Sequence, residues 1–91
     1  MVRAPTELDA LTAPAFRDHL AMLLSYGAES LVIEMHDVEF VDSSGMGALV
    51  AARKLAAERG GGLWLHGVRE RVAASLRLAG LTDFLGVVEN T

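Results

Sequence analysis

Apolar residues recur along the chain with two different periods, and the two kinds of segment alternate. Phe16, Leu20, Leu23 and Leu24 share one face at helical spacing, and Gly27 is a natural stop for that helix. Thr12 precedes the helix as a candidate N-cap, with Pro14 tolerated in the first turn. The run from Leu31 to Met35 is short and mostly apolar, which is typical of a strand covered on both faces.

The same alternation continues to the end of the chain. After an extended piece over Val38 to Val41, Asp42-Ser43-Ser44-Gly45 opens a helix that we expect to run to about Arg59. The buried stripe of this helix comprises Gly45, Ala48, Leu49, Ala52 and Ala56. The remaining predicted elements are a strand over Leu63 to Val68, a helix over about Arg69 to Ala79 with Val72 and Leu76 inward, and a last strand over Phe84 to Val88.

This order predicts an α/β fold, in which helices pack on a mixed, largely parallel sheet. A length of 91 residues corresponds to one domain, spanning 1–91. Only Val2 to Thr6 precede the first loop, so a strand there would have no earlier hairpin partner. We therefore expect an exposed sheet edge, which is a route to a homo-oligomer.

Composition and charge exclude several classes of function. A net charge of −4 argues against direct binding to nucleic acid, which needs a basic surface. The chain has no cysteine, and its three histidines show no ligand-like spacing with carboxylates, so we expect neither a metal nor a cofactor. No apolar run reaches the length of a membrane span. These features favour a cytoplasmic protein that does not bind a membrane.

Three strand-to-helix junctions carry the candidate chemistry, because functional loops of parallel sheets gather beyond the carboxyl ends of the strands. They are Glu7-Leu8-Asp9, Asp42-Ser43-Ser44-Gly45 and Val68-Arg69. At the second junction, Asp42 or Ser43 could simply cap the helix. A cap does not explain two serines followed by Gly-x-Gly, since a glycine inside a helix costs about 1 kcal/mol relative to alanine. Such glycines let another backbone come close, and the helix N-terminus favours an anion.

Asp42-Ser43-Ser44-Gly45-Met46-Gly47 resembles the Asp-Ser-Ser-Gly-Leu-Gly signature of the anti-sigma factor antagonists, whose fold is the STAS domain. Glu7-Leu8-Asp9 resembles the Gly-Glu-Leu-Asp loop of the same family, with Thr6 in place of the glycine. Gly61-Gly62 before a strand and Ala79-Gly80-Leu81 near the end match as well. The family also has a hairpin before this region and a helix after the last strand, and we expect this chain to lack both.

The resemblance implies a switch protein rather than an enzyme. The unphosphorylated protein would bind an anti-sigma factor that is also a serine kinase, and would thereby free a sigma factor. The kinase would phosphorylate Ser44, the second serine of the motif, and a serine phosphatase would reset the switch. The exposed apolar pair Met46 and Val50 extends the expected partner surface. That surface comprises Asp9, Asp42, Ser43, Gly45, Met46, Gly47 and Val50.

Two other functions remain open at this point. A STAS domain can be a scaffold, as a subunit of a lipid transporter or of a stressosome-like assembly, without a phosphoserine switch. A sensor of a small molecule or nucleotide could instead use the helix N-terminus as an anion site. Catalysis is not expected, because Ser44 lacks the Gly-x-Ser-x-Gly context of a nucleophile elbow.

Overall fold

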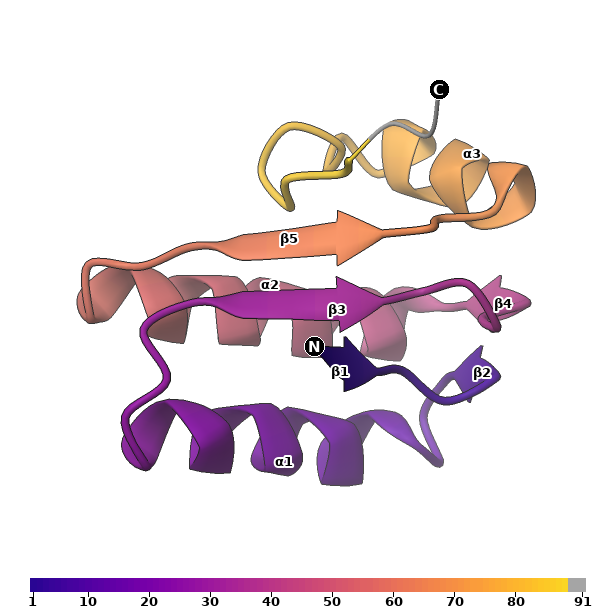
Figure 1. Cartoon of the computed structure of the whole chain (residues 1–91). Helices are drawn as coiled ribbons and strands as arrows, with labels where there is room; N and C mark the ends of the chain where they lie inside the picture. Colours follow the sequence, from indigo (N-terminus) through magenta and orange to yellow (C-terminus); the bar gives the residue numbers. More distant parts are fainter. Residues whose placement is uncertain (89–91) are drawn as a thin grey trace.

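The strands form two small parallel sheets. The computed structural model describes residues 1–88. One sheet has the order β1-β3-β5, from Val2–Arg3, Leu31–Glu34 and Leu63–His66. The other pairs β2 with β4, from Glu7–Leu8 and Phe40–Val41. The helices are α1 (Ala13–Ser25), α2 (Ser43–Glu58) and α3 (Glu70–Leu78), as Figure 1 shows. The predicted α/β class with a parallel sheet is confirmed.

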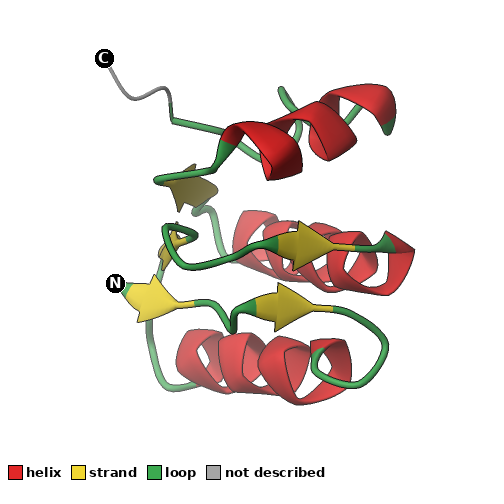
Figure 2. Ribbon diagram, turned by 90° about the vertical axis from the view of Figure 1, so that its right-hand side faces the viewer, coloured by secondary structure: helices red, strands yellow, loops and turns green. Residues whose placement is uncertain are grey.

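Helices α1 and α2 pack against each other on one face of the three-stranded sheet. Figure 2 shows that sheet edge-on, with both helices on the same side of it. Their apolar stripes meet the inward-facing residues of the strands. Leu20, Ile33, Leu49 and Leu65 are completely buried in this layer. The predicted inward residues Val72 and Leu76 of α3 are buried as well.

The opposite face of the sheet is open in residues 1–88, which corrects the expectation that the Leu31 to Met35 strand is covered on both faces. Val32 and Trp64 pair in the ladder and are 37% and 44% exposed. The Trp64 ring lies against the backbone of Gly62 and Gly86. A Cβ atom added at either glycine would contact the ring. Beside this apolar pair, Glu34 accepts a hydrogen bond from the backbone N–H of His36 at 2.8 Å and lies 3.2 Å from Nδ1 of His66. These two contacts hold the pKa of Glu34 below its usual value.

The predicted last strand over Phe84 to Val88 is wrong. The segment turns instead, with the backbone N–H of Leu85 donating to the Leu81 carbonyl at 2.9 Å. Gly86 has a φ of 61°, which brings the chain back to β5 for a single parallel bridge between Val87 and Leu65. The apolar composition of the segment reflects the burial of Leu85, not a strand.

Candidate functional site

All three helices begin at one edge of the molecule. The strands of both sheets point toward the right-hand side of Figure 1, and α1, α2 and α3 start there. The expectation that the three strand-to-helix junctions share an edge is therefore confirmed. The third junction is tied to the β3–β4 loop, because Nε of Arg69 donates to the carbonyl of His36 at 2.7 Å.

Ser43 and Ser44 are exposed at the start of α2. Asp42 is the N-cap residue, with extended backbone, and its Oδ1 accepts a hydrogen bond from the backbone N–H of Gly45 at 3.0 Å. The capping role is therefore taken by Asp42, which leaves both serine hydroxyls free of that task. Ser44 is the second residue of a 16-residue helix, in the first turn, where backbone N–H groups have no acceptor within the helix.

The two glycines that follow have different surroundings. Gly45 is buried, and a Cβ at this position would overlap the backbone carbonyl oxygen of Leu8 in β2. Gly45 therefore lets α2 pack directly on β2, so its burial favours a packing role over direct contact with a partner. Gly47 is exposed, and a Cβ there would meet nothing within 4 Å. The fold does not require glycine at position 47, although it requires one at position 45.

Asp9 organises the loop between β2 and α1. Its Oδ1 accepts hydrogen bonds from the backbone N–H groups of Leu11 at 3.0 Å and Thr12 at 3.2 Å. Thr12 occupies the N-cap position but makes no side-chain cap, which corrects the predicted capping role. Its hydroxyl instead donates to the Glu7 carbonyl at 2.7 Å. In the Asp9 turn the side chain of Leu11 is 90% exposed, an exposed apolar residue that the sequence analysis did not single out.

Replacing Asp9 with alanine is expected to destabilise the protein by about 1 kcal/mol, because the backbone N–H of Leu11 loses its acceptor and that of Thr12 keeps only the backbone carbonyl of residue 9. Asp9→Asn keeps an oxygen acceptor at the same position and should recover most of that loss. Urea unfolding of the three proteins measures the difference. Equal stability of Asp9→Ala and the unsubstituted protein would contradict the assigned role of the Asp9 carboxylate.

A shallow hollow of about 340 Å³ lies between the first turns of α1 and α2, beside Ser44. Small residues form most of its lining, and one cation, Arg17 of α1, shares it with Ser44. The residues that line this Ser44 groove are Ala10, Ala13, Pro14, Arg17, Ser44, Gly47 and Ala48. Arg17 was not among the predicted site residues, since no motif or local spacing in the sequence connects it with Ser44.

Met46 and Val50 are half-buried and pack against the core with part of their surface. The sequence predicts an exposed pair, whereas each side chain is only partly exposed. Neither residue lines the Ser44 groove.

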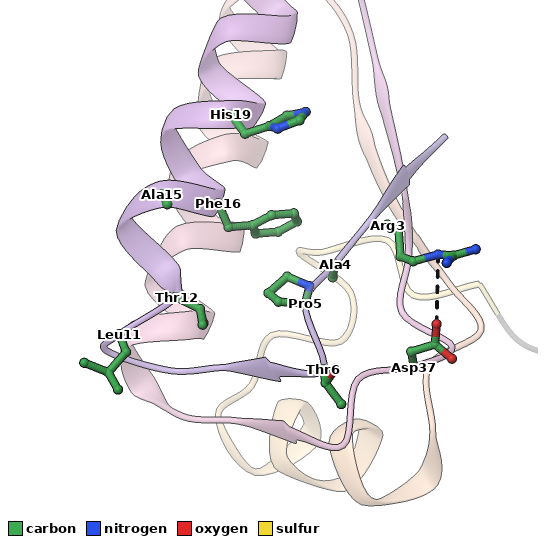
Figure 3. A pocket seen from close by; sticks show the side chains of 10 residues that line it. All are labelled: Arg3, Ala4, Pro5, Thr6, Leu11, Thr12, Ala15, Phe16, His19 and Asp37. Atoms are coloured by element: carbon green, nitrogen blue, oxygen red, sulfur yellow. Dashed lines mark ion pairs between the residues drawn. The ribbon is translucent and has the colours of Figure 1, made fainter.

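A larger hollow of about 770 Å³ lies between β1 and α1 (Figure 3). The Phe16 side chain points into this hollow, while that of Leu11 points away from it. At the rim, Nε of Arg3 lies 3.9 Å from Oδ2 of Asp37. None of the predicted site residues lines this hollow. Within residues 1–88 no group of three or more potential ligands is placed to hold a metal ion. In that part of the chain, no helix has both the length and the apolar character needed to cross a membrane.

Comparison with known proteins decides the family. The model of the STAS domain matches residues 1–91. The chain belongs to the STAS domain family. A STAS relative, the anti-sigma-B factor antagonist of Bacillus subtilis, is 35% identical over 89% of this chain and 73% of its own length. The anti-sigma-B factor antagonist of Staphylococcus aureus is 28% identical over 99% of this chain and 83% of its own length.

Solved STAS structures agree with this assignment. A crystal structure from Thermotoga maritima, described as that of a candidate anti-sigma factor antagonist, superposes with a TM-score of 0.86 at 25% identity. The match covers 96% of this chain and 76% of that one. An NMR structure of the same Thermotoga protein gives a TM-score of 0.84.

Proposed function

We propose that this STAS domain is an anti-sigma factor antagonist controlled by phosphorylation of Ser44. In this proposal the unphosphorylated chain binds an anti-sigma factor in the cytoplasm and frees a sigma factor. The relatives named anti-sigma-B factor antagonists support the role. The observation that carries the proposal is the exposed Ser44 at the start of α2, with the capping task already met by Asp42.

The modification is a phosphoryl transfer from ATP, catalysed by the anti-sigma factor acting as a serine kinase. The Ser44 Oγ attacks the γ-phosphorus, a new O–P bond forms, and the bond from the γ-phosphorus to the bridging oxygen breaks to release ADP. The hydroxyl proton passes to a base of the kinase. A serine phosphatase hydrolyses the phosphate ester and restores the hydroxyl. Ser44 is accessible for both reactions, because its residue is exposed at a helix start.

The partner surface would centre on the start of α2. Ser43, Ser44 and Gly47 are its exposed members, and Asp9 and Asp42 support it through the turn and the cap that they form. Half-buried Met46 and Val50 would add apolar contact area at the rim. A hydroxyl at position 44 can lie at the centre of such an interface, whereas a phosphate would lose its water there and face no prepared cation on the anti-sigma factor.

Incubation with kinase-type anti-sigma factors and ATP tests the proposal. We expect the intact mass of the unsubstituted protein to rise by one phosphate, and the same gain in Ser43→Ala, which keeps Ser44. Ser44→Ala should gain no mass. Phosphorylation of Ser44→Ala to the same extent as the unsubstituted protein would place the modified residue elsewhere and overturn the proposal.

A further inference from the structure

Arg17 is the cation that the fold places beside Ser44. Both residues line the Ser44 groove, although 27 positions separate them in the sequence. Helix α1 packs on α2 more extensively than any other pair of elements, which fixes their relative position. Helical side chains tend to lean toward the N-terminus of their own helix, and α1 begins at the same edge as α2, so an arginine at position 17 can extend toward the start of α2.

The guanidinium of Arg17 is available for a new ligand. Its present ion pair is with the adjacent Asp18, at 3.8 Å between Nε and Oδ1, and both side chains are more than half exposed. Neighbouring exposed residues gain little from such a pair. The two carboxylates of the site are already engaged, because Asp42 accepts from Gly45 and Asp9 accepts from Leu11 and Thr12. Among residues 1–88, Arg17 is the single charged residue that lines the groove with Ser44.

We propose that Arg17 binds the phosphate of phosphorylated Ser44 across this groove. The inference rests on the proposed function, since it concerns the modified state of the same serine. Arginine suits the task because its planar fork of N–H donors matches two phosphate oxygens at once. Apart from Arg17 and Ser44, the groove is lined by alanine, glycine and proline residues, whose small size leaves room for the phosphoryl group.

The Arg17–phosphate pair would act in two ways. It offsets the repulsion of the phosphate by Asp42 and Asp9, so the modified domain stays folded. It also fills the Ser44 groove, and a partner side chain can no longer enter there. Phosphorylation would thus change the shape of the surface as well as its charge.

The test uses the full chain with phosphoserine installed at position 44 during translation, so that no kinase is needed. Phosphorus NMR follows the second ionisation of the phosphate in the unsubstituted protein, in Arg17→Ala and in Arg17→Lys. We expect the titration midpoint of Arg17→Ala to lie about half a pH unit above that of the unsubstituted protein, because a nearby cation favours the dianion. Arg17→Lys should fall between the two, since a point charge lacks the fork.

Arg59→Ala is the matched control. It removes the same charge at the far end of α2, roughly 22 Å along the helix axis from Ser44. Its midpoint should equal that of the unsubstituted phosphoprotein. The Arg17 Nε–H signal should also shift when Ser44 is phosphorylated, and this measurement needs no substitution.

Identical midpoints for the unsubstituted protein and Arg17→Ala, or an equal change in Arg59→Ala, would overturn the inference. An Arg17 Nε–H signal that does not respond to phosphorylation would do the same. Failure of the proposed function is distinguishable from either result. A kinase that ignores Ser44 would refute the switch but leave the titration of the installed phosphoserine unchanged.

Discussion

Ser44→Asp is expected to bind the anti-sigma factor at least roughly tenfold more weakly than the unsubstituted protein. Ser44→Ala should stay bound to the anti-sigma factor, because it cannot be phosphorylated at position 44. A charge buried without a partner in an interface costs several kcal/mol, and every 1.4 kcal/mol is tenfold in affinity. Aspartate carries less charge than phosphate, so its effect sets a lower limit for the modification. The dissociation constants of the three proteins can be measured by titration calorimetry.

The matched control for this series is Ser43→Asp. It adds the same charge one residue earlier in the exposed start of α2, outside the lining of the Ser44 groove. We expect a smaller loss of affinity than for Ser44→Asp. Equal losses in both variants would show that added charge at the helix start, rather than position 44, decides binding.

Substitution of the two glycines with alanine should move stability in opposite directions. Gly45→Ala is expected to destabilise the domain by about 1–3 kcal/mol, because the new methyl group overlaps the Leu8 carbonyl and forces α2 away from β2. For a domain of this size, each kcal/mol corresponds to about 4–8 °C in Tm. Gly47→Ala should stabilise by up to about 1 kcal/mol, since the site is open and alanine is the better helix former.

Gly47→Ala also tests the groove. Its methyl group would project into the hollow beside Ser44, so we expect weaker partner binding from a protein that is more stable. Denaturant unfolding and a binding titration on the same samples separate the two effects. A Gly45→Ala protein as stable as the unsubstituted one would contradict the packing of α2 on β2, and unchanged affinity of Gly47→Ala would remove the groove from the interface.

The sequence predicted the start and the extent of α2 well because the signals there are local. Helix α2 was expected from Asp42 to about Arg59, and it runs from Ser43 to Glu58 with Asp42 as its cap. The cap and the apolar stripe lie at or within the segment that they determine. Parallel pairing of the strands followed from the alternation of elements, since a strand that crosses over through a helix returns parallel.

Features that depend on distant contacts escaped prediction. Val32 lies in a strand that the sequence predicts to be covered on both faces, because apolar composition does not show whether a second layer covers the sheet. Phe84 to Val88 was taken for a strand, since a buried Leu85 in a turn gives the same short apolar run. Arg17 and Ser44 line the same groove only through the packing of α1 on α2, which no local pattern encodes.

The central claim is that phosphorylation of Ser44 releases the partner without unfolding the domain. The most direct measurement is the affinity of one anti-sigma factor for the unmodified protein and for the protein carrying phosphoserine at position 44, with circular dichroism of both free forms. We expect unchanged spectra and an affinity loss of more than roughly tenfold. Equally tight binding by the phosphoprotein, or loss of its helical spectrum, would contradict it.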